Sequence, residues 1–96
     1  MARFDMDAAA MAAMAPAAAT PAAMAGEACL ALGMMYASGR SVSLDLVAAH
    51  KWFNVAAHRG CRAAVAHRAE VAQDMSADDV AAALREARLF LAATRH

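Results

Sequence analysis

Helical spacing over residues 28–60 constrains the fold of this chain more than any other feature of its sequence. Ala28, Leu32 and Tyr36 lie four residues apart, so their side chains stack on one face of a helix. Gly39 follows, and glycine suits the left-handed backbone conformation that commonly ends a helix. The first part of the segment therefore predicts a helix that stops near residue 38.

A second helix follows after a short turn. Ser43 or Asp45 is expected to cap its first turn, and Gly60 to end it. Its predicted apolar arc consists of Ala49, Trp52, Phe53, Ala56 and Ala57. Trp52 is expected to be the buried anchor that faces the first helix, and Gly33 to permit close approach of the two backbones. The segment thus predicts a helical hairpin.

Taken together, these positions resemble the Sel-one-like repeat, a relative of the tetratricopeptide repeat. The matching residues are Ala28, Leu32, Gly33, Tyr36, Gly39, Val42, Asp45, Ala49, Trp52, Phe53, Ala56, Ala57 and Gly60. The match covers about a third of the chain, and Ser41 stands where the family usually has a second turn glycine. The resemblance implies a non-catalytic scaffold or adaptor, of the kind that acts in bacterial signalling, secretion and envelope regulation.

The chain of 96 residues is long enough for one small domain. Residues 1–19 form a low-complexity arm rich in alanine and methionine, and residues 20–96 form the repeat domain. We expect helices over about 21–38, 44–59, 61–74 and 77–94, the last capped by Ser76. Residues 61–96 resemble a degenerate capping repeat, in which Arg68 and Ala72 replace the leucine and tyrosine of the first repeat. The expected fold is all-α: a short right-handed solenoid of two antiparallel hairpins.

Charge and hydropathy limit the classes of partner and location. The formal net charge is zero, which removes the case for a general nucleic-acid binder. The uncharged run 8–26 is interrupted by Pro16 and Pro21, so a membrane span is not expected. We predict a cytoplasmic protein. The alternative is a periplasmic protein whose residues 1–25 are a signal segment, since Ala23-Met24-Ala25 resembles a cleavage site.

No catalytic constellation is present in the sequence, and no enzymatic activity or cofactor is expected. The serines fall at turns or helix starts, and no nucleophile lies beside a base. His58, Cys61 and His67 are a remote candidate for a metal site, but a second pair of ligands at zinc spacing is missing. Cys29 and Cys61 do not make a disulfide framework, and free thiols are the expected state, with a bridge between them as the alternative.

Other polar residues have simpler interpretations. His50, Asn54 and His58 are one helical turn apart, opposite Trp52, and are expected to form a solvated stripe. A local basic patch consists of Arg59, Arg62 and Arg68. Pairing of this patch with Glu70 or Asp74, or plain solvation, explains it as well as phosphate binding does.

The predicted partner site lies on the first helix, on a face that the repeat pattern leaves free. Leu30 and Met34 are both apolar there, and Glu27 and Ser38 flank them. Such a surface suits an amphipathic helix or an extended peptide of another protein. The alternative occupant is the arm of the chain itself, through Met11 and Met14. The identity of the partner and the oligomeric state are not encoded in any motif.

Overall fold

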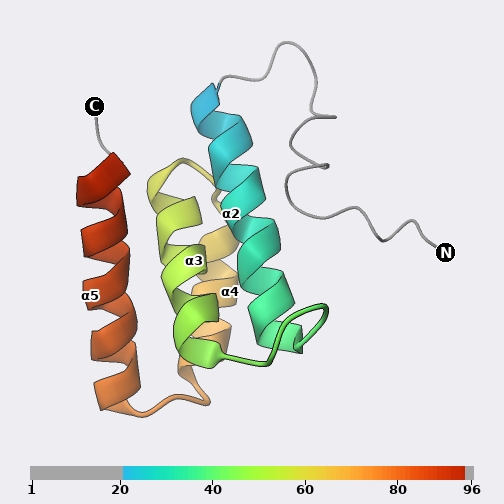
Figure 1. The fold of residues 1–96 in the computed structure, drawn as a ribbon, viewed down its shortest axis with the longest axis vertical. Coiled ribbons are helices and arrows are strands. Elements are labelled where there is room, and N and C mark those ends of the chain that lie inside the picture. The colour runs from blue at the N-terminus through green and yellow to red at the C-terminus, as the bar shows by residue number, and fades with distance from the viewer. Residues whose placement is uncertain (1–20, 95–96) are drawn as a thin grey trace, which may run out of the picture.

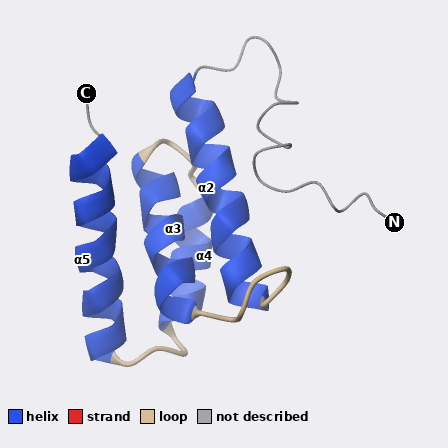
Figure 2. Ribbon diagram, in the orientation of Figure 1, coloured by secondary structure: helices blue, strands red, loops and turns tan. Residues whose placement is uncertain are grey.

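The computed structural model describes the backbone of residues 21–94 and the side chains of residues 25–94. Four helices make up this part of the chain: α2 (Pro21–Ser38), α3 (Leu46–His58), α4 (Ala63–Ala72) and α5 (Ala77–Thr94). No strand occurs within residues 21–94, which confirms the all-α fold class (Figure 2). The predicted arm, residues 1–19, lies outside the described residues.

The helices alternate in direction, so that consecutive helices run antiparallel (Figure 1). Helix α3 lies at the centre and packs against α2, α4 and α5, whereas the other helix pairs in residues 21–94 touch only marginally. Helix α5 therefore docks beside α3 and runs parallel to it, with α4 on a third side of α3 (Figure 1). Helix α3 is therefore the element that holds the described part of the chain together.

The turn between α2 and α3 follows from two left-handed residues and one cap. Gly39 has a φ of 71°, as predicted, and Ser41 adopts a φ of 69°. Ser41 thus takes a left-handed backbone conformation that glycine adopts more readily. Asp45, not Ser43, caps α3: its Oδ1 accepts a hydrogen bond from the Ala48 N–H at 3.0 Å. Because Asp45 is the cap, α3 begins at Leu46 and not at the predicted 44.

The other helix ends differ in how many of their free backbone N–H and C=O groups are hydrogen-bonded. Gly60 ends α3 with a φ of 96°, and the Cys61 N–H reaches back to the Ala56 carbonyl at 3.0 Å. Ser76 caps α5 as predicted, since its Oγ accepts from the Asp79 N–H at 3.0 Å. Helix α4 has no side-chain cap at Arg62 and spans only residues 63–72, shorter than the predicted 61–74. The chain therefore holds α4 less firmly at its ends than α3 or α5.

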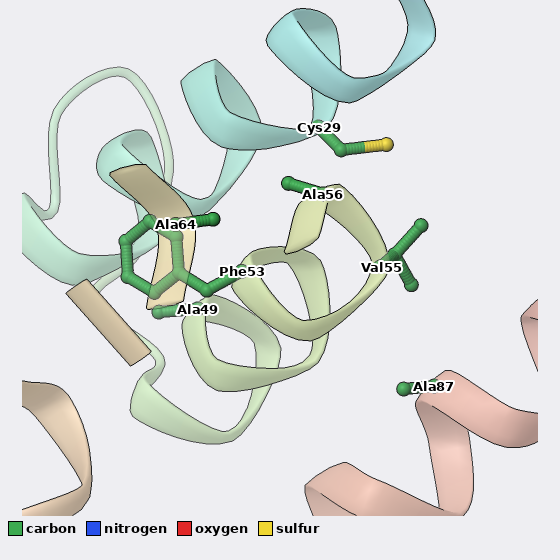
Figure 3. Packing of buried hydrophobic residues seen from close by; sticks show 7 residues of the cluster. All are labelled: Cys29, Ala49, Phe53, Val55, Ala56, Ala64 and Ala87. Atoms are coloured by element: carbon green, nitrogen blue, oxygen red, sulfur yellow. The ribbon is translucent and has the colours of Figure 1, made fainter. Parts of the chain in front are cut away.

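The core is small and rich in alanine, which lets the helices approach closely. Phe53 and Val55 of α3 are its largest fully buried side chains. The buried cluster contains Cys29, Ala49, Phe53, Val55, Ala56, Ala64 and Ala87, from all four helices (Figure 3). The ring of Phe53 lies against Gly33 so closely that a Cβ added there would be 2.5 Å from the ring. Gly33 thus faces α3 in a close contact, as predicted, but the contact is made by the Phe53 ring and not by the α3 backbone.

The role predicted for Trp52 is wrong. Trp52 is only half-buried and does not face α2; it packs edge-to-face on Phe90 of α5, with ring centroids 4.9 Å apart. Phe53 is the anchor between α3 and α2. Adjacent residues on a helix point about 100° apart, so the two aromatic rings serve two different neighbouring helices.

The buried face of α2 also differs from the predicted one. Gly26, Cys29 and Gly33 are buried, whereas Ala28 and Leu32 are half-buried. Phe53 accounts for this rotation, because its ring fits only where α2 presents a residue without a side chain. The stripe of largest residues on α2 was therefore a poorer guide to the core than its small residues.

Candidate functional site

Of the two apolar residues of the predicted partner site on α2, one is exposed and the other packs against the core. Met34 is 45% exposed and projects from the surface. Leu30, one turn earlier, is half-buried and packs against the buried cluster. Met34 is thus available to a partner, while Leu30 forms the edge where this surface meets the core.

The two flanking residues differ in what they offer. Glu27 is exposed and lies seven residues before Met34, two helical turns away on the same side of α2. Ser38 is also exposed, but its hydroxyl donates to the Met34 carbonyl at 2.8 Å. Glu27 therefore supplies a negative charge near Met34, whereas the hydroxyl proton of Ser38 is occupied by the end of its own helix.

Three more large apolar side chains are exposed, and sequence reasoning did not find them. They are Leu44 in the α2–α3 turn, Val65 on α4 and Leu89 on α5. Leu89 is 67% exposed and Leu44 62%, both more than Met34. Each of the three lies in a different part of the chain. An isolated apolar residue outside the apolar face of a helix gives no periodic signal, so the sequence pattern did not reveal that these side chains are exposed.

The remote metal candidate is not assembled. The His67 ring stacks on Phe53 with centroids 5.4 Å apart, and its Nδ1 lies 3.9 Å from Glu70 Oε1. His58 is exposed, and Cys61 is half-buried beside Gly26. Within residues 25–94, no three His, Cys, Asp or Glu side chains are placed to share a metal ion.

The stripe of His50, Asn54 and His58 is not the solvated surface that was predicted. His50 is only 3% exposed, and Asn54 Oδ1 accepts a hydrogen bond from Arg68 Nη1 of α4 at 2.5 Å. Only His58 is exposed. Helix α4 packs on this side of α3 and covers the first two residues, an outcome that the spacing of the polar residues alone did not indicate.

Burial changes the acidity of His50. Loss of hydration lowers the pKa of its imidazole, and the nearby positive charge of Arg68 lowers it further. Its Nδ1 is buried and has no hydrogen-bond partner among the described residues. His50 is thus a neutral, incompletely satisfied group inside the α3–α4 interface.

Two of the three arginines of the predicted basic patch lie in different interfaces, and Arg62 is exposed. Arg68 binds Asn54, while Arg59 donates from Nη2 to Thr94 Oγ1 of α5 at 2.8 Å. Arg59 also lies 5.6 Å from the ring centroid of Phe90, and Lys51 Nζ lies 4.4 Å from that of Trp52. The described partners of the two arginines are therefore not Glu70 and Asp74. They act as cross-helix contacts and not as a joint phosphate site.

Both cysteines are free thiols. Cys29 lies in the core, and burial raises the pKa of its thiol, against a smaller opposing effect of the positive charge on Arg59. Cys61 is half-buried in the turn before α4. A raised pKa and burial make Cys29 a poor nucleophile, which fits a packing role.

Among the described helices, none combines the length and the apolar character that a membrane span needs. The chain matches no protein-family model, no curated protein and no solved structure.

Proposed function

We propose that this chain is a non-catalytic protein-interaction module of the Sel-one-like repeat type, acting as a cytoplasmic adaptor. The observation that carries the proposal is Met34, a large apolar side chain 45% exposed on α2 next to the half-buried Leu30. A first helix of a repeat hairpin that presents such a pair, with the acidic Glu27 beside it, suits the apolar face of a partner helix or peptide. Glu27 favours a partner with a basic residue about two turns from its apolar anchor.

A capture experiment with two matched variants tests the proposal. The parent protein is immobilised, a captured protein is identified by mass spectrometry, and its Kd is measured for each variant with purified components. We expect Met34→Ser to weaken binding about tenfold or more, as loss of a buried apolar anchor does. Leu89→Ser removes a more exposed leucine from α5 and is expected to leave the Kd unchanged. Equal effects of both variants would contradict a binding site on α2.

The arm of the chain is the competing occupant of the same surface. If residues 1–19 cover Met34, their deletion lowers the melting temperature and increases dye binding or self-association. If an outside partner is the occupant, the deletion leaves the melting temperature nearly unchanged and Met34→Ser abolishes capture. No effect of either change would leave Met34 as an ordinary exposed hydrophobic residue.

An exported form of the same module is a second candidate. The specific observation is that Ala25 precedes Gly26, the first buried residue among those described, so removal of residues 1–25 shortens α2 but keeps its buried residues Gly26, Cys29 and Gly33. Such a protein would bind a periplasmic partner. Mass spectrometry of the protein purified from its native source distinguishes the two, since a mass that lacks residues 1–25 indicates export.

A further inference from the structure

His50 occupies an unusual position in the α3–α4 interface. It is a titratable side chain that is 3% exposed, and its Nδ1 has no hydrogen-bond partner among the described residues. Asn54, one turn further along α3, has an amide oxygen next to this site, but that oxygen accepts from Arg68. The interface therefore contains an imidazole whose Nδ1 is unpaired among the described residues. A backbone hydrogen bond at His50 opposes the lowering of its pKa, but it is the smallest of the three effects, after burial and the charge of Arg68.

Protonation of this imidazole carries two unfavourable consequences. It places a positive charge in a buried site, and it turns Nδ1 into a donor that lacks an acceptor among the described residues. The charged group that acts on His50 from α4 is Arg68, which has the same sign and so adds repulsion. A protonated His50 is consequently more stable in water than in the interface.

The other titratable groups nearby do not offset this charge. On α4, His67 stacks on Phe53, and Glu70 lies beside His67 but does not contribute to the shift at His50. On α3 itself, His58 is exposed at the end of the helix, and neither Lys51 nor the capping Asp45 contributes to the shift at His50. From α2, Glu27 does not contribute to it either. From α5, none of the charged side chains Asp78, Asp79, Arg85, Glu86 and Arg88 contributes to the shift at His50.

Helix α4 is the element that is easiest to release. It has 10 residues, no side-chain cap at its start, and Ala64 as its single buried residue. Helix α2, by contrast, contributes 18 residues and holds α3 through the contact of Gly33 with Phe53. Loss of the α3–α4 interface therefore costs less than loss of the α2–α3 hairpin.

We propose that His50 is an acid-sensitive latch, whose protonation releases α4 from α3 while the α2–α3 hairpin stays folded. Release removes His67 from the ring of Phe53 and uncovers the side of α3 that carries His50 and Asn54. Acidification thus exposes a second, mixed apolar and polar surface on the central helix.

The direction of the pH effect follows from the lowered pKa of His50. Below the ordinary histidine pKa of about 6.5, the open state binds a proton that the closed state does not bind. The closed state is accordingly favoured at neutral pH and loses stability as the pH falls. Each unit of pH in this range multiplies the opening constant by up to about ten.

Amide hydrogen exchange on the full chain, corrected for the intrinsic pH dependence of exchange, measures this opening helix by helix. We expect the opening constant of α4 amides to rise up to about tenfold between pH 6 and pH 5, while central α2 and α3 amides stay protected. His50→Leu, which replaces the imidazole with an apolar side chain, is expected to abolish the rise. His58→Gln, the matched change at an exposed histidine, and His67→Gln are expected to retain it.

Two results would overturn the proposal. One is a pH-dependent opening of α4 that persists in His50→Leu. The other comes from the unaltered chain, and so does not depend on whether that variant folds: ring NMR signals of His50 that titrate between pH 7 and pH 5 while α4 keeps its protection. Coincidence of the His50 titration with the loss of α4 protection is the supporting result.

Discussion

Phe53 fills a space that exists only because α2 has a glycine at position 33. The ring is fully buried, Gly33 lies on one side of it, and the His67 ring stacks on it at 5.4 Å. With a ring in the next helix and a backbone opposite, Phe53 has little room to move. The two residues therefore function as one packing unit.

Gly33→Ala is expected to destabilise the protein although alanine favours helices. The added Cβ would lie 2.5 Å from the Phe53 ring, and overpacking of this kind costs roughly 1–3 kcal/mol, against a helix-propensity gain of up to about 1 kcal/mol. Denaturant unfolding measures the difference. The double variant Gly33→Ala with Phe53→Leu should recover part of the loss, and a stabilised single variant would contradict the contact.

Phe53 and Trp52 are expected to differ in a way that the sequence does not show. Phe53→Ala removes a fully buried ring and should lower the free energy of unfolding by about 3–5 kcal/mol. Trp52→Ala should cost clearly less, because Trp52 is half-buried against Phe90. Thermal melts of the two variants decide the order, and a larger loss for Trp52→Ala would reverse our assignment of the anchor.

Ser41→Gly is expected to stabilise the turn before α3. Ser41 is exposed with a φ of 69°, a conformation that costs a residue with a side chain roughly 1 kcal/mol relative to glycine. A rise in melting temperature should follow. Ser43→Gly is the matched control: it is also an exposed serine of the turn but does not share the positive φ, so this change should be neutral or slightly destabilising.

At the scale of helices, capping side chains set where α3 and α5 begin. Asp45 and Ser76 each accept a backbone N–H of the first turn at 3.0 Å. Helix α4 starts without such a bond. The two parallel helices, α3 and α5, thus begin at a capping side chain, whereas α4 between them does not.

Asp45→Ala should cost roughly 0.5–2 kcal/mol, because the cap bond to Ala48 and a favourable charge at the helix start are both lost. Chemical denaturation gives the value. Asp74→Ala is the control, since Asp74 is an exposed aspartate outside a helix start. Equal effects of the two changes would show that the Asp45 cap contributes nothing beyond general surface charge.

Helix boundaries could be predicted from the sequence because they depend on residues that are adjacent in the chain. The predicted bounds 21–38 and 77–94 agree with α2 and α5, where Ser76 and Gly39 mark ends that any local reading detects. The side of each helix that is buried could not be predicted equally well. Which side of α3 meets α4 decides the burial of His50, and that choice depends on a helix placed later in the chain.

For the whole molecule, helicity is expected to be independent of bound metal. The ligand candidates His58, Cys61 and His67 have separate surroundings, and the described residues hold no cluster of three ligands. The circular-dichroism spectrum and the melting temperature should therefore be unchanged by excess chelator. A loss of helical signal on chelation would contradict this and point to a metal held in another way.

The fold class was predictable for the whole molecule, whereas the candidate site was predictable only in part. The composition and the spacing of small residues were enough to indicate an all-α hairpin fold. On α2, spacing identified Met34 as exposed, but it could not show that Leu30 packs on the core. Leu44 and Leu89 went unnoticed, because an isolated exposed leucine leaves no periodic signal.

The central position of α3 also sets an order for folding. Helices α2 and α3 are consecutive, so their contact closes a short loop and costs little chain entropy. Helix α5 reaches α3 only after α4 and its connections have been spanned, which makes its docking the longer-range event. A ribosome releases α2 and α3 first, so the nascent chain carries a ready hairpin nucleus on which each later helix finds the same template.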